Sequence, residues 1–204
     1  QNGRKYEKRK FLYNHYGGYA LMYGKEIEKV LIPRGDVEKR LKEVAGQIGR
    51  DYDGQDVLFI CVLRGAFMFF ADMVREISEY NVNAQVDFIA VSSYGDGTES
   101  SGEVKFVKDC TTPVAGKNVI IVEDIVDSGI TLNYLKKVFL SREPKSLRIC
   151  TLLDKPERRR AELIPDYKLF EIPNEFVVGY GLDYNEDFRA LKDVCVLAPW
   201  VYEK

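Results

Sequence analysis

Short apolar runs alternate with amphipathic stretches along most of this chain. The three clearest runs are mostly apolar and are bounded by turn-forming or charged residues: 56–63, 117–124 and 146–154. A continuous apolar run of this length is typical of a strand that is buried on both faces. Further strands are predicted at 85–94, 167–172 and 176–182.

Between these runs, apolar residues recur three or four positions apart, which is the spacing of an amphipathic helix. Helices are predicted at 36–52, 65–80 and 131–141. In the first of them, Asp36 follows Gly35 and is the predicted N-cap. Strands that alternate with helices predict an α/β fold with a mostly parallel, twisted sheet flanked by helices on both faces.

Length and charge narrow the class of protein. The chain has 204 residues, 46% of them hydrophobic, which suits one α/β domain or one domain with a small appendage. Its net charge is −2, so bulk charge predicts no nucleic-acid partner. The apolar runs are too short to cross a bilayer and the first ten residues are charged, so no membrane association or secretory signal is expected.

The number and position of cysteines and histidines limit the kinds of catalytic and metal site that the chain could form. The chain has four cysteines and no CxxC pair, so free thiols in a reducing compartment, the cytoplasm, are predicted at Cys61, Cys110, Cys150 and Cys195. The single histidine, His15, lies in a Tyr/Gly-rich stretch that is typical of a surface position. Histidine-activated nucleophiles and histidine-based zinc sites are therefore not expected.

The stretch VIIVEDIVDSGIT (119–131) carries the most distinctive chemistry. Glu123 and Asp124 end an apolar strand, where the ligands of a parallel sheet collect. Asp127 follows, and then come small residues that open a predicted helix, whose exposed N–H groups favour a phosphate. Acids beside a phosphate cradle suit the hydroxyls of a phosphorylated ribose, or Mg²⁺ shared with that ligand. The chain has no GxxxxGK[ST] sequence, so a P-loop is excluded.

A purely structural interpretation of this loop also exists. Any strand-to-helix turn favours Asp, Ser, Gly and Thr. Two acids directly after an apolar strand are less easily explained in this way, because their desolvation needs compensation.

The same 13 residues closely resemble the phosphoribosyl pyrophosphate (PRPP) motif of the type I phosphoribosyltransferases. The wider resemblance, over about residues 27–200, is to the 6-oxopurine branch, the hypoxanthine-guanine phosphoribosyltransferases. Four more stretches carry it, in the family's order: CVLRGAFMFFAD (61–72), VSSYGDG (91–97), LLDKPERR (152–159) and FVVGYGLDYNEDFR (176–189).

The resemblance implies a role for each matching residue on the PRPP side. Glu123 and Asp124 would bind the ribose hydroxyls, directly or through Mg²⁺, and Asp127 would be the general base at purine N7. The 5′-phosphate would be bound by residues from Asp127 onward: Ser128, Gly129, Ile130 and Thr131. Pyrophosphate would contact a loop formed by Leu63, Arg64 and Gly65, in which the family often has a cis peptide bond. It would also contact Arg189.

On the base side, the resemblance implies that Lys155 donates to the 6-oxo group and that Phe176 stacks on the purine. Backbone groups of Val177 and Asp183 would read the purine edge, and the Asp183 side chain would lie near Mg²⁺. The predicted metal residues are thus Glu123, Asp124 and Asp183. Ser93 and Tyr94 match the tip of a mobile lid.

The family implies purine salvage: transfer of the 5-phosphoribosyl group from PRPP to N9 of hypoxanthine, guanine or xanthine, with release of pyrophosphate. It also implies a type I phosphoribosyltransferase core at about 50–155 and a small hood formed by 27–49 and 156–204, with 1–26 outside the match. A homodimer or homotetramer is expected by resemblance alone.

Each assignment has an ordinary structural alternative. Lys155 could be one of many solvated charges, and Phe176 could be an ordinary residue of the hydrophobic core. Asp183 could be a turn residue, and Arg189 could form an ion pair at the surface. Three other functions also remain open: a PRPP-sensing regulator that binds RNA or protein, a phosphoribosyltransferase for adenine or pyrimidines, and a subunit that has lost catalysis.

Overall fold

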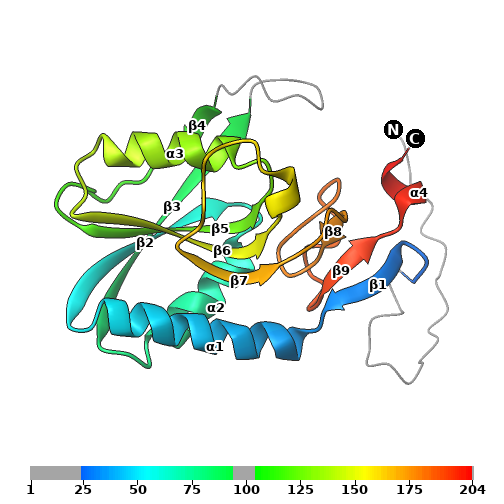
Figure 1. The fold of residues 1–204 in the computed structure, drawn as a ribbon, viewed down its shortest axis with the longest axis horizontal. Coiled ribbons are helices and arrows are strands. Elements are labelled where there is room, and N and C mark those ends of the chain that lie inside the picture. Colours follow the sequence, from blue (N-terminus) through cyan, green and yellow to red (C-terminus); the bar gives the residue numbers. More distant parts are fainter. Residues whose placement is uncertain (1–23, 94–103, 204) are drawn as a thin grey trace, which may run out of the picture.

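A computed structural model describes residues 24–93 and 104–203 of the chain (Figure 1). The predictions for His15 and Tyr94 concern residues outside these ranges. Most of the segment 1–26 lies outside them as well.

A six-stranded sheet forms the centre of the molecule. Its strand order is β4-β3-β2-β5-β6-β7, and every neighbouring pair is parallel except β3 and β4. The strands are β2 (Gln55–Leu63), β3 (Val82–Ser93), β4 (Val104–Lys108), β5 (Asn118–Val126), β6 (Ser146–Asp154) and β7 (Tyr167–Glu171). The predicted mostly parallel sheet is confirmed.

Helices cover both faces of this sheet (Figure 1). The helices α1 (Arg34–Asp51) and α2 (Phe67–Ile77) pack into one apolar cluster, and α3 (Ile130–Leu140) packs into another. Alternate residues of β2 enter the two clusters: Val57, Phe59 and Cys61 the first, and Leu58, Ile60 and Val62 the second. This period of two explains why a strand buried on both faces is apolar throughout.

A second, three-stranded antiparallel sheet joins the two ends of the described chain. Its order is β1-β9-β8, with β1 (Ile27–Ile32), β9 (Val194–Leu197) and β8 (Val177–Val178). One face packs into the main core through Ile32, Val177, Val194 and Val196. The other face has its own apolar cluster, against which the last helix, α4 (Pro199–Tyr202), packs with Val201 and Tyr202.

Some element predictions were wrong in detail. Helix α1 begins at Arg34, two residues before the predicted N-cap, because the buried carboxylate of Asp193 accepts a hydrogen bond from the Arg34 N–H at 2.7 Å. The segment 176–182 forms a strand only at β8, since Gly179 and Gly181 have positive φ angles of 94° and 103°. The strands β1, β4 and β9 and the helix α4 were not predicted.

Other expectations agree with the structure. All four cysteines are free, as predicted; Cys61, Cys150 and Cys195 are buried, and Cys110 is only partly buried. Within the described ranges, no helix combines the length and the apolar character needed to cross a membrane.

Candidate active site

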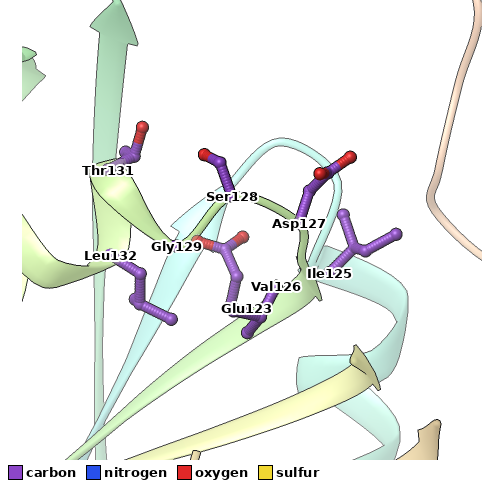
Figure 2. Close-up of a pocket in the computed structure, with 8 residues that line it drawn as sticks. All are labelled: Glu123, Ile125, Val126, Asp127, Ser128, Gly129, Thr131 and Leu132. Carbon is purple, nitrogen blue, oxygen red and sulfur yellow. The ribbon is translucent and has the colours of Figure 1, made fainter. Parts of the chain in front are cut away.

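The phosphate-binding loop predicted from the sequence lies at the carboxyl end of β5, in the centre of the main sheet. A pocket opens there and is lined by Glu123, Ile125, Val126, Asp127, Ser128, Gly129, Thr131 and Leu132. Figure 2 shows the side-chain oxygens of Asp127, Ser128 and Thr131 directed to the same open side of the loop. Ile125, Val126 and Leu132 of this lining are not among the site residues predicted from the sequence.

Glycine makes the turn from β5 into α3 possible. Gly129 has φ 76°, in the left-handed region, and α3 begins at the next residue, Ile130. The first turn of this eleven-residue helix therefore directs backbone N–H groups at the pocket, where the helix dipole favours an anion. Two backbone hydrogen bonds hold the loop in place: the Ser128 carbonyl accepts from the N–H groups of Arg160 (2.9 Å) and Ala161 (3.1 Å).

Glu123 and Asp124 lie side by side at this end of β5. Desolvation by the surrounding protein raises the pKa of both carboxyls, and the charge of Asp124 adds to the rise at Glu123. A cation or hydroxyl donors between these two groups would offset the cost of ionising them together. The pair therefore fits a divalent cation or the hydroxyls of a ribose.

The predicted pyrophosphate loop contacts these acids. The peptide bond between Leu63 and Arg64 is cis, which the resemblance had led us to expect. Gly65 lies directly against the Asp124 carboxylate, so that no side chain could be accommodated there. On its other side, the Gly65 carbonyl lies against Gly181, where again no Cβ would fit. Two glycines thus allow three distant segments of the chain to meet at Asp124.

Both arginines predicted to contact pyrophosphate form ion pairs with acids of the segment that follows Gly181. Arg189 forms an ion pair with Asp183 at 2.8 Å and donates to the Gly181 carbonyl at 2.8 Å. Arg64 pairs with Glu186 at 3.0 Å. The carboxylates of Glu123, Asp124 and Asp183 do not form one metal-binding cluster, and the described part of the chain contains no group of three or more such ligands.

Two of the predicted base-binding residues, Lys155 and Phe176, lie on the β6 side of β5, opposite the β2 side that leads to Gly65. Lys155 directly follows β6, is buried, and donates from its Nζ to the Glu175 carbonyl at 2.7 Å. Burial lowers the pKa of its ammonium group. Phe176 is next to that carbonyl, with 37% of its surface exposed, and Val177 begins β8. The Lys155 N–H donates to the Val126 carbonyl at 2.9 Å, which connects this side to the loop.

Asp127 has a partner that the sequence did not predict. The Arg158 Nε donates to its carboxylate at 2.6 Å, and the Arg158 Nη1 donates to Asn174 at 3.2 Å. Arg158 follows Lys155 in a run of charges, and its position in that run gives no sign of a partner in the loop after β5. Of the two predicted lid residues, Ser93 ends β3, and Tyr94 lies outside the described residues.

Comparisons with known proteins agree with this geometry. A family profile described as "Phosphoribosyl transferase domain" matches residues 33–185. A Bacillus subtilis hypoxanthine-guanine phosphoribosyltransferase is 48% identical over 178 residues, which are 87% of this chain and 97% of the relative. The chain belongs to the hypoxanthine-guanine phosphoribosyltransferase family.

Other members of the hypoxanthine-guanine phosphoribosyltransferase family are similar over comparable lengths. The Mycobacterium tuberculosis enzyme is 46% identical over 193 residues, which cover 92% of this chain and 94% of that protein. A Staphylococcus aureus hypoxanthine phosphoribosyltransferase structure has a TM-score of 0.85 at 40% identity, covering 89% of this chain and 97% of that one. A Trypanosoma cruzi structure has a TM-score of 0.84 at 45% identity, covering 87% and 95%.

Proposed function

We propose that this chain transfers the 5-phosphoribosyl group of PRPP to N9 of a 6-oxopurine, giving the nucleoside 5′-monophosphate and pyrophosphate. One arrangement supports the proposal: β5, which ends in the two acids and the loop 127–131, lies between β2, which is followed by Gly65, and β6, which is followed by Lys155. Groups suited to the ribose phosphate, to the leaving pyrophosphate and to the base are therefore neighbours at one edge of the sheet.

The 5′-phosphate would bind the N–H groups of the first turn of α3, together with the hydroxyls of Ser128 and Thr131. The ribose hydroxyls would donate to Glu123 and Asp124. Pyrophosphate would lie beside Gly65, where backbone groups can come close to it, and Arg64 and Arg189 would exchange their acidic partners for its oxygens.

Mg²⁺ would supply positive charge to the leaving pyrophosphate. The pair Glu123 and Asp124 fits such an ion, because both carboxyls have raised pKa values without one. Asp183 lies apart from that pair and would take part on the pyrophosphate side. If this assignment is right, chelation of divalent cations should abolish turnover, and added Mg²⁺ should restore it.

Asp127 would accept the N7 proton while N9 bonds to C1′ and the C1′–pyrophosphate bond breaks. Its carboxylate is bound by Arg158, and both side chains are partly exposed (40% and 47%). An exposed pair of this kind is weak, so a purine could displace the guanidinium at little cost.

Lys155 should decide which purines are accepted. A 6-oxo group accepts a second hydrogen bond from the Lys155 ammonium, beside the one that the Glu175 carbonyl accepts, whereas the 6-amino group of adenine would leave that N–H of a buried cation without an acceptor. Such a loss costs about 1–3 kcal/mol or more, so adenine should be turned over at least ~5-fold less efficiently. The kcat/KM values of adenine and hypoxanthine measure this directly, and equal values would contradict the role of Lys155.

The deciding experiment is an ultraviolet absorbance assay with PRPP, Mg²⁺ and one base at a time: hypoxanthine, guanine, xanthine or adenine. Turnover of one or more oxopurines, with adenine inert, is the expected result, and it also ranks the three oxopurines. Tight PRPP binding without turnover of any base would contradict the proposal and favour a PRPP-sensing regulator.

We also propose that the chain forms a homo-oligomer and acts in the cytoplasm. Phe67, Val86 and Phe88 leave 37–45% of their surfaces exposed, and Phe88 packs on Phe70 of α2 at 5.4 Å between ring centroids. An exposed apolar patch over α2 and β3 fits contact with a second copy. Four free thiols fit a reducing compartment. Light scattering after gel filtration would give the subunit number, and a monomer would contradict the first part.

A further inference from the structure

The ring of Phe176 is held by two other aromatic side chains. Tyr202 stacks on it, with 4.8 Å between ring centroids and 22° between ring planes. Tyr184 meets it edge-on at 5.6 Å and 89°. Because 37% of Phe176 is still exposed, these two neighbours cover part of the ring and leave part of it open.

Backbone hydrogen bonds fix helix α4, which carries Tyr202, relative to β9, and they fix β9 relative to Phe176. The Leu197 N–H at the end of β9 donates to the Phe176 carbonyl at 2.9 Å. Helix α4 starts two residues later at Pro199, and the Val201 N–H donates to the Ala198 carbonyl at 3.0 Å. Figure 1 shows α4 continuing directly from β9, beside the three-stranded sheet. Tyr202 therefore approaches Phe176 from a fixed point.

We propose that Tyr202 is a positioning residue for the purine: it holds the Phe176 ring in the plane on which the base stacks. The inference rests on the proposed function, and it adds a residue to the base site. With Tyr202 on one face of Phe176, the opposite face is left for the purine, and the three rings form one continuous stack. Tyr202 does not touch the base and acts through Phe176.

Geometry separates this role from ordinary core packing. A half-exposed ring such as Phe176 has few core neighbours to fix its orientation, so loss of one stacked neighbour frees it to turn. Trp200 lies on the same short helix but is 63% exposed, and no ring contact joins it to Phe176 among the described aromatic pairs. It provides a matched control for changes to α4 itself.

The test compares Tyr202→Ala, Tyr202→Phe and Trp200→Ala with the unchanged full chain. For Tyr202→Ala we expect the KM for hypoxanthine to rise roughly threefold to tenfold, the size of one lost aromatic pair, with kcat and the KM for PRPP changed less than about twofold. Tyr202→Phe keeps the stack and should restore the KM for the base. Trp200→Ala should behave as the unchanged protein.

Calorimetric titration with inosine 5′-monophosphate provides a second measurement that does not depend on turnover. Tyr202→Ala should weaken its binding by a similar factor. An unchanged KM for hypoxanthine and unchanged nucleotide binding would overturn the inference. The inference would also be overturned if the KM values for hypoxanthine and for PRPP rose together and the Tm fell, because that combination indicates a merely structural role for Tyr202. If the unchanged protein turns over no base, the proposed function fails, while the nucleotide titration still tests Tyr202.

Discussion

Asp127→Asn should reduce kcat with hypoxanthine by about 10²-fold or more while PRPP still binds. We propose its carboxylate as the acceptor of the N7 proton, and general-base assistance is typically worth ~10²–10⁴-fold. The amide has nearly the same shape, and the phosphate would bind backbone N–H groups, so PRPP affinity should change little. Steady-state kinetics and a PRPP binding isotherm measure the two effects separately.

Asp36→Asn is a suitable control. It replaces the same carboxylate by the same amide, at an exposed position on α1 outside the loop. The Tm of both variants should match that of the unchanged protein, since the pair that Asp127 forms with Arg158 is partly exposed and contributes little stability. A kcat within about threefold of the unchanged value would remove Asp127 from the role of base.

Gly65→Ala should be at least as damaging, for a steric reason. A methyl group at this position would occupy the space of the Asp124 carboxylate, and the Gly65 carbonyl is itself held against Gly181. Either Asp124 moves away from the position proposed for binding the ribose, or the loop 63–65 moves away from the proposed pyrophosphate site. Overpacking of this kind costs about 1–3 kcal/mol even without a function to lose. We expect kcat/KM for PRPP to fall by roughly 10²-fold.

Gly35→Ala tests whether this loss comes from crowding. A Cβ at Gly35 would meet nothing within 4 Å, and the residue lies in α1, where alanine stabilises a helix by up to about 1 kcal/mol relative to glycine. Activity should stay unchanged and the Tm should stay equal or rise. Equal activity of the two alanine variants would show that the close contact between Gly65 and Asp124 is not needed.

The main sheet could be predicted from the sequence because its signal is local. In β2, consecutive residues enter opposite apolar clusters, so burial on both faces appears directly as an unbroken apolar run. The loop after β5 could be predicted for a similar reason, since its acids, its glycine and its helix start are neighbours in sequence. The resemblance then supplied candidates in segments whose own pattern was ambiguous.

Contacts between distant segments could not be predicted in this way. The first N–H group of α1 donates to Asp193 and not to the nearby Asp36, because the buried carboxylate just before β9 lies within hydrogen-bond distance of it. A run of arginines does not reveal that Arg158 binds Asp127. Tyr202 near the end of the described chain carries no motif, and only the fold brings its ring to Phe176.

Because β1 pairs with β9, the three-stranded sheet can be completed only after the last part of the described chain has been translated. Ile27 of β1 lies opposite Leu197 of β9, so the first described strand leaves the ribosome long before its partner is made. By then β5 and α3 have already been synthesised. A nascent chain halted before Val194 contains the loop 127–131 but lacks β9, the strand that pairs with β8, and with it Tyr202. A premature stop codon in this region would therefore leave the proposed phosphate loop complete and remove the ring that stacks on Phe176.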